Sequence, residues 1–166
     1  MIDEQPSFKR WSASRGVTMV ELAMVVLISM ITAAVALPIV QTTVNKYQLK
    51  GATASATWAI QSTRFQALMQ GYSYQVTLSG GTGGVNPTYQ IASKPLGATS
   101  YSNIGSSIPL SGKPVVLGAT TVFQFQPNGT VATSPVTSSP FTFTIAYSGT
   151  TETITVSNYG NVNVTP

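Results

Sequence analysis

The side chains that could carry out chemistry are few in this chain and lie far apart. It contains no histidine and no cysteine, and beyond Gly16 its only acidic residues are Glu21 and Glu152. Most enzyme mechanisms need a group that titrates near neutrality, a pair of carboxylates, a nucleophile with its base, or a metal site. No such set can be assembled here, and no S-x-x-K motif supports a Ser-Lys pair. We therefore predict that the protein is not an enzyme and holds no metal or cofactor.

Glu21 occupies a position that needs a physical explanation. An apolar run follows it over 22–40, with Ser29 and Thr32 as the only polar interruptions. At about 1.5 Å per residue in a helix, the run approaches the roughly 30 Å of a membrane hydrocarbon core. A lone charge at the centre of a bilayer costs about 2.5–3.5 kcal/mol on insertion scales. A partner that compensates for the Glu21 charge is therefore expected.

The composition is that of one folded domain with an anchoring segment. The chain has 166 residues, of which 43% are hydrophobic and only 7% are charged, whereas about 25% is typical. Its net charge is +4, but the basic residues form no cluster in the sequence, so we expect no nucleic-acid partner. Three bases precede the apolar run and five follow it: Lys9, Arg10 and Arg15, then Lys46, Lys50, Arg64, Lys94 and Lys113.

A single long helix is predicted over 17–70. Pro38 should kink this helix without ending it, because helix-forming residues both precede and follow it. Beyond residue 41, apolar residues recur every three or four positions, which is typical of one helix face packed on a partner. We expect that face to lie against a sheet, with some unwinding at Gly51. The face consists of Tyr47, Gly51, Ala54, Trp58, Phe65 and Leu68, with Gln61 as its polar member.

After Gly71 the apolar pattern changes from helical spacing to alternation, which predicts antiparallel strands. The fold class expected is α+β, a long N-terminal helix, transmembrane and then amphipathic, packed on an antiparallel β-sheet domain. Residues 96–113 are expected to form a loop, Glu152 to lie near a turn, and the phenylalanines at 123, 125, 141 and 143 to fill the core. The predicted strands are 72–78, 88–93, 114–118, 120–126, 129–132, 141–148, 151–157 and 161–164.

The apolar run admits two ordinary interpretations. A secretory signal peptide would be cut near Ala34-Val35-Ala36 and would leave a secreted β-domain protein. The acidic Glu21 inside the run, and a helical pattern that continues past the cut, argue against it. A simple single-span anchor would instead place Glu21 close to the polar headgroups, where a charge costs less.

A third interpretation comes from the residues GVTMVELAMVV at 16–26. They resemble the prepilin signature of type IV pilins and type II secretion pseudopilins, in which a glycine precedes the mature chain and a glutamate is its fifth residue. Counting from Val17 makes Glu21 the fifth residue and Pro38 the twenty-second, where the family commonly has a kinking proline. The resemblance implies cleavage between Gly16 and Val17 by a membrane prepilin peptidase, and N-methylation of Val17.

The same resemblance implies that Glu21 and Pro38 serve in assembly. The Glu21 carboxylate would pair with the positively charged amino terminus of a neighbouring subunit, so that a charge that is costly alone becomes favourable in the filament. The implied partners are the prepilin peptidase, other pseudopilins or pilins, and an inner-membrane assembly platform. The implied location is the bacterial inner membrane, crossed once, with the leader cytoplasmic and the C-terminal domain periplasmic.

The segments FQFQPNGT, FTFTI and ITVSNYGNVNV are similar to the GspH/FimT branch of this family. This likeness implies a minor pseudopilin (GspH-like) of a type II secretion pseudopilus. A FimT-like minor pilin of a type IV pilus, active in pilus assembly or DNA uptake, is the alternative. DNA-uptake members carry arginines after the late glycine, whereas Asn161 and Asn163 follow Gly160 here. The division expected is a leader at 1–16, an assembly helix at 17–40, its amphipathic half at 41–71 and a periplasmic β-rich domain at 72–166.

Overall fold

The computed structural model describes residues 16–80, 85–110, 115–134 and 139–166. Its first element is helix α1, Met19–Gln70, whose 52 residues span about 80 Å at 1.5 Å per residue. The helix begins two residues later than predicted and continues through Pro38. It also continues through Gly51, so the unwinding expected there does not occur. The chain divides into two compact units, Met1–Val40 and Gln41–Pro166.

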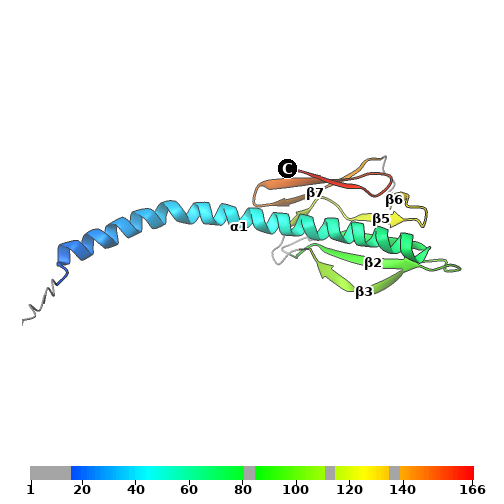
Figure 1. Ribbon diagram of the computed structural model, residues 1–166, viewed down its shortest axis with the longest axis horizontal. Coiled ribbons are helices and arrows are strands. Elements are labelled where there is room, and N and C mark those ends of the chain that lie inside the picture. The colour runs from blue at the N-terminus through cyan, green and yellow to red at the C-terminus, as the bar shows by residue number, and fades with distance from the viewer. Residues whose placement is uncertain (1–15, 81–84, 111–114, 135–138) are drawn as a thin grey trace, which may run out of the picture. The chain divides into compact units, whose positions relative to one another are not determined.

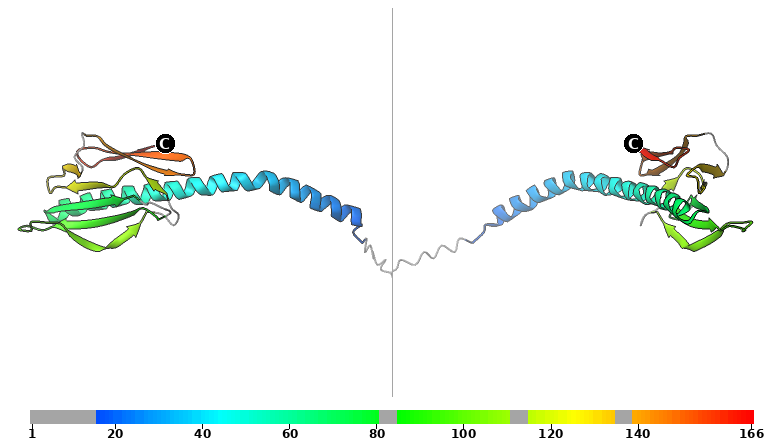
Figure 2. Two further views of the ribbon diagram at one scale, coloured as in Figure 1. Left: turned by 180° about the vertical axis from the view of Figure 1, so that it is seen from behind. Right: turned by 45° about the vertical axis from the view of Figure 1, so that its right-hand side comes forward.

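The strands of the second unit form two antiparallel sheets, and the second half of α1 runs alongside strands of both (Figures 1 and 2). This confirms the predicted α+β arrangement. The five-stranded sheet has the order β3-β2-β1-β5-β6, and the four-stranded sheet has the order β4-β7-β8-β9. The bounds are β1 Ser73–Ser79, β2 Thr88–Lys94, β3 Ser102–Pro109, β4 Val116–Leu117, β5 Thr121–Phe125, β6 Val131–Ser134, β7 Phe141–Tyr147, β8 Thr150–Val156 and β9 Val162–Thr165.

Alternation in the sequence produces the buried face of each central strand. In β1 every second residue is buried, and in β7 Phe141, Phe143 and Ile145 are buried while the residues between them are exposed. Phe123 of β5 lies opposite Val76 of β1, which stacks two buried positions across the pair. Because side chains on a strand have a period of two, this register keeps the apolar residues on the core side.

The hairpin between β7 and β8 closes through a two-residue turn. Ser148 and Gly149 have φ values of 48° and 79°, and Tyr147 pairs with Thr150 across the turn. Positive φ at both central residues is the type I′ geometry, which matches the twist of antiparallel strands. The Nδ2 amide of Asn45 donates to the Ser148 hydroxyl oxygen at 3.1 Å, which tethers this turn to α1.

One hydrophobic core joins α1 to both sheets. The Phe123 ring of β5 lies 6.4 Å from the ring of Phe141 and 5.8 Å from that of Phe143, so β5 and β7 meet through aromatic contacts. All four phenylalanines expected in the core are buried. The helix contributes mainly small side chains, which let its backbone approach the strands closely. Its buried residues are Leu49, Ala52, Thr53, Ala56, Ala59, Ile60, Thr63 and Ala67.

One prediction about the β-domain is wrong. Strand β3 lies within the segment 96–113, where the sequence predicts a loop. All eight residues of β3 are exposed, because it is an edge strand that pairs only with β2. A strand with no buried face has no apolar alternation to reveal it. Glu152 lies within β8, opposite Ile145, and near the Ser148-Gly149 turn, as expected. Residues 111–113 are outside the described residues.

Candidate assembly interface

The predicted cleavage site lies immediately before the first turn of α1. Gly16 and Val17 are exposed and outside regular structure. The Thr18 hydroxyl oxygen accepts a hydrogen bond from the Glu21 N–H at 3.2 Å, and its carbonyl accepts one from the Leu22 N–H at 3.1 Å. Thr18 is therefore the N-cap of the helix. The leader residues 1–15, including Lys9, Arg10 and Arg15, are outside the described residues.

Glu21 lies in the first helical turn, where its negative charge is favourable to the helix dipole. The spacing Thr18-x-x-Glu21 is also that of a capping box, a signal that the sequence analysis did not use. No basic group among the described residues lies within 4.0 Å of the Glu21 carboxylate. Capping explains why a helix can begin here, but it leaves the charge of the exposed carboxylate without a partner within the described chain.

The segment between Met19 and Val40 is apolar and wholly exposed. It is long and apolar enough to cross a membrane, and none of that span is buried. Apart from Glu21, its two polar side chains, Ser29 and Thr32, bond to the helix itself. The Ser29 hydroxyl donates to the Val25 carbonyl at 2.7 Å, and the Thr32 hydroxyl donates to the Ile28 carbonyl at 3.0 Å. Such internal hydrogen bonds are what a lipid environment requires. Pro38, seventeen residues after Glu21, contributes no N–H of its own.

The apolar face of α1 that the sequence predicts to pack on the sheet is exposed instead. Tyr47, Trp58 and Phe65 are 71%, 59% and 62% exposed, and Leu68 is 45% exposed. The correction has a physical cause: the alanines on the opposite side of α1 repeat with the same helical period, and their small side chains fit closer to the strands. We call the exposed residues Tyr47, Trp58, Phe65, Leu68 and Met69 the aromatic stripe.

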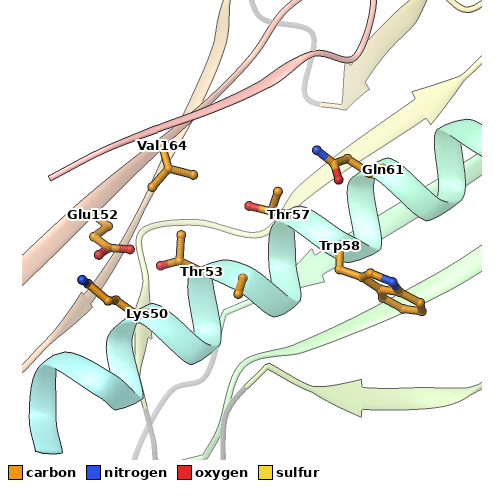
Figure 3. A pocket seen from close by; sticks show the side chains of 8 residues that line it. Lys50, Thr53, Thr57, Trp58, Gln61, Glu152 and Val164 are labelled. Carbon is orange, nitrogen blue, oxygen red and sulfur yellow. The ribbon is translucent and has the colours of Figure 1, made fainter.

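Two grooves flank the aromatic stripe. On one side, a groove of about 430 Å³ separates α1 from β8 and β9, and the Lys50 amine and the Glu152 carboxylate point toward each other across it (Figure 3). On the other side, a groove of about 320 Å³ lies between α1 and the residues Tyr89, Ile108 and Pro109. The Trp58 and Tyr89 rings meet edge to face there, with centroids 6.5 Å apart. The aromatic stripe is thus an exposed surface with a groove on each side.

The basic side chains of the described residues line several different grooves, and no metal-binding group of side chains is found among those residues. No group of three His, Cys, Asp or Glu residues among them could hold a metal ion. Lys46 and Lys50 share one shallow groove on α1, Lys94 lines a separate cleft beside β2, and Arg64 lines a third. Lys113 lies outside the described residues.

The comparisons with known proteins agree with this architecture. No curated protein sequence matches the chain at a significant level. A crystal structure of the type IV minor pilin FimU from Pseudomonas aeruginosa shares its fold, and a second crystal form of FimU also aligns with the chain. The first aligns with 15% identity and a TM-score of 0.52 over 73% of this chain and 90% of FimU. The second aligns with 16% identity and a TM-score of 0.48 over 71% of this chain and 93% of FimU.

A family model described as type II transport protein GspH matches residues 52–160. The match begins within α1 and ends at the glycine before β9, so it spans the second half of the helix and most of both sheets. It covers more than half of the sequence. The chain therefore belongs to the GspH family.

Proposed function

We propose that the chain is a minor pseudopilin of a type II secretion pseudopilus, a structural subunit without catalytic activity. Prepilin peptidase would cut it between Gly16 and Val17, and its helix would then carry it from the inner membrane into the assembly. Membership of the GspH family supports the pseudopilin role. The exposed apolar segment of α1 supports a helix that serves as both anchor and assembly element.

The observation that carries the proposal is the position of Gly16 and Val17. Both residues are exposed and lie in non-helical backbone just before α1 begins at Met19. A protease needs a peptide whose backbone groups are not engaged in helical hydrogen bonds, and the position of Gly16 and Val17 outside the helix supports cleavage at this junction. Cutting there leaves the apolar helix attached to the β-domain, whereas a signal-peptide cut near residue 36 would fall inside continuous helix.

The new amino terminus at Val17 would supply the positive counter-charge that the Glu21 carboxylate lacks. A Glu21 carboxylate and the terminal amine of a neighbouring subunit would neutralise each other in an apolar setting, where ionic attraction is screened far less than in water. Such a pair has its full effect only at the correct axial position of the two helices. Glu21 would thereby set the register of assembly.

The experiment is intact-mass and amino-terminal mass spectrometry of the mature protein extracted from membranes. We expect a terminus at Val17 that carries an N-methyl group. Gly16→Leu should leave the precursor uncut and in the membrane, because the peptidase accepts only a small residue before the scissile bond. Ala13→Leu, which also enlarges a small residue of the leader but away from the junction, is the control and should be cut normally. A terminus at Leu37 would contradict the proposal.

A minor pilin of a type IV pilus is the second candidate function. The fold that the chain shares with FimU, itself a type IV minor pilin, favours it. Deleting the gene in its native host separates the two. Loss of protein secretion with normal piliation supports the pseudopilin, while loss of piliation with normal secretion supports the pilin.

A further inference from the structure

The Arg64 side chain of α1 lies against Gly160, in the turn between β8 and β9. A Cβ placed on Gly160 would lie 2.7 Å from Arg64 Cδ and 3.1 Å from Phe125 Cε1. Gly160 also has a φ of 72°, a conformation that favours glycine. The turn is held by Ser157, whose carbonyl accepts from the Gly160 N–H at 2.8 Å. The absence of a side chain at Gly160 thus creates the space that Arg64 fills.

Beside Arg64 lies a cleft of about 370 Å³ between α1 and the start of β9. We call it the Arg64 cleft. Its rim is mixed: Phe65 and Leu68 are large apolar side chains of the aromatic stripe, and Asn161 and Gln61 bring side-chain amides. Gly160 and Val162 complete the lining. An apolar rim around a guanidinium and two amides suits a ligand with a charged head and an apolar stem.

Arg64 has no partner among the described residues. Its Nε is buried and donates no hydrogen bond, and no acidic group of those residues lies within 4.0 Å of its guanidinium. Leaving a buried donor unsatisfied is costly, and an arginine side chain stays charged at every physiological pH. The site is therefore built around a cation whose counter-charge is missing.

The chain itself can hardly supply that counter-charge. After Gly16 its sequence contains only two acidic side chains, Glu21 and Glu152. Glu21 belongs to the apolar first unit, and Glu152 points toward Lys50 in the groove of Figure 3. A second copy of the chain would bring the same two carboxylates, already placed in the same way.

We propose that the Arg64 cleft binds a carboxylate side chain of a neighbouring pilin-like subunit whose sequence differs from this one. This inference rests on the proposed function, since it requires assembly with other subunits. The guanidinium would bind both oxygens of an Asp or Glu carboxylate through parallel N–H groups. Phe65 and Leu68 would cover the pair and exclude water, which strengthens it. The site would make this chain select a different subunit in preference to its own copy.

A nucleic-acid phosphate fits the cleft less well than a carboxylate. No second base among the described residues lines the cleft, and the next base along α1, Lys50, is about 21 Å away at 1.5 Å per residue. Proteins that bind the nucleic-acid backbone neutralise several phosphates at once. An isolated arginine with an apolar rim is typical of protein contacts.

The test is site-specific photo-crosslinking of the full-length chain in its native host. Benzoylphenylalanine replaces Val162, in the cleft, or Val116, exposed on β4 as the matched control. We expect a Val162 crosslink to a peptide of another pilin-like subunit that has an Asp or Glu within a few residues of the crosslinked position. Arg64→Gln should reduce this crosslink at least ten-fold, while Lys46→Gln, which removes one charge from the same helix, should change it less than two-fold.

Three results would overturn the proposal: a Val162 crosslink to a second copy of this chain, a crosslink to nucleic acid, or a crosslink unchanged by Arg64→Gln. If thermal melts in detergent micelles show that Arg64→Gln is unfolded, Arg64→Lys takes its place. It keeps the charge but cannot bind two oxygens through one planar group, so the crosslink should fall at least three-fold. An unchanged crosslink in Arg64→Lys also overturns the proposal.

Charge reversal then tests the pairing itself. Arg64→Glu should abolish the crosslink, and changing the identified partner carboxylate to Arg should restore it to at least half of the wild-type level. Failure to restore overturns the proposal. Cleavage after Gly16 is measured in the same samples. If cleavage and membrane residence are normal and the Arg64 variants leave the crosslink unchanged, only the proposal about the cleft is rejected. If the chain is not cleaved after Gly16, the proposed function is rejected.

Discussion

The apolar side chains are exposed in one of the two units of the chain, whereas the other unit buries many of its apolar side chains in a core. Every described residue up to Val40 is exposed, although almost all of that segment is apolar. The unit Gln41–Pro166 instead encloses a core that includes the fully buried Phe123, Phe125 and Ile145. A segment with its own core needs no partner in order to fold. A segment that leaves its apolar side chains exposed needs lipid or other protein chains around it.

The same contrast recurs on the two faces of α1 after residue 41. One face buries alanines against the strands, and the other presents the aromatic stripe. Exposed Trp58 and Phe65 side chains are unusual for a helix that has a sheet to pack on. The second unit therefore has a packed core on one side of α1 and an exposed apolar face, available for binding, on the other. The comparison can be tested at single residues, beginning with the first unit.

The largest effect is expected from Glu21→Val. Removing the charge makes the membrane helix more apolar, so the precursor should still insert and still be cut after Gly16. Assembly should fail, because the proposed partner of the neighbouring terminal amine is gone. We expect crosslinking to other pilin-like subunits to fall at least ten-fold, measured in membranes of the native host. Glu21→Gln, which keeps the shape but loses the charge, should behave like Glu21→Val.

Normal crosslinking in both Glu21 variants would show that assembly does not need the Glu21 carboxylate, while the bond from the Glu21 N–H to the Thr18 hydroxyl oxygen is kept in both. The helix would then be an ordinary anchor. Thr18→Ala provides the matched control, since it removes the cap and keeps the carboxylate. Its expected cost is about 1 kcal/mol of helix stability, and assembly should continue.

The second prediction compares a buried phenylalanine with an exposed one. Phe123→Ala removes a fully buried ring that contacts Phe141 and Phe143, so it should lower the free energy of unfolding by about 3–5 kcal/mol. Phe65→Ala should change it by no more than about 0.5 kcal/mol, while crosslinking to other subunits decreases. Urea unfolding of the full chain in micelles, followed by circular dichroism, measures both. Equal destabilisation would mean that Phe65 is part of the core.

Much of the fold could be predicted because it depends on local patterns. Alternating apolar residues revealed β1, β2 and β7, and the strands predicted at 141–148 and 151–157 left a short connection where the turn between β7 and β8 lies. Helical periodicity showed which residues share a face of α1. It could not show which face turns inward, because the alanines repeat with the same period as the aromatic residues. Side-chain size misled the prediction, since large apolar residues are usually the buried ones.

The Arg64 cleft could not be predicted from sequence in the same way. Arg64 and Gly160 meet only because α1 and the turn after β8 are brought together by the core, and no local pattern links residues so far apart. Strand β3 escaped detection for a different reason, because backbone pairing with β2 places it and no buried face marks it. The motif around Gly16 that resembles a prepilin cleavage site is local too, so the sequence alone predicts it, and it stays a prediction.

The third prediction places the same substitution on the two faces of α1. Ala56 is fully buried and Ala54, two residues earlier, is exposed. Ala56→Leu should cost about 1–3 kcal/mol, because three added carbon atoms have no room between helix and strands. Ala54→Leu should stay within about 0.5 kcal/mol of wild type. Alanine and leucine have similar helix propensities, so urea unfolding of the two variants reports packing alone. A larger cost at Ala54 would reverse the assigned faces.

The smallest effect at neutral pH is expected from Tyr74→Phe, at the core of the five-stranded sheet. The Tyr74 hydroxyl donates to the Tyr72 hydroxyl oxygen at 3.1 Å, and the two rings stack with centroids 5.1 Å apart. Losing that hydrogen bond should cost about 1 kcal/mol. Burial, followed by the hydrogen bond to Tyr72, raises the pKa of Tyr74 to about 12, whereas an unfolded tyrosine has a pKa of about 10.

Because the folded state holds Tyr74 in its neutral form, the group stabilises the fold fully below pH 10, and this contribution is lost as the pH rises from 10 toward 12. Burial also raises the pKa of Tyr89, so the ionisation of Tyr89 likewise lowers the stability of the folded state as the pH rises. Tyr74→Phe keeps the buried ring and has no proton to lose, so its urea midpoint should fall less steeply over this range than that of the wild type. Tyr47→Phe, on the exposed aromatic stripe, should leave the wild-type slope unchanged. If the slopes of Tyr74→Phe and wild type coincide, ionisation of Tyr74 is not coupled to the folding of the sheet.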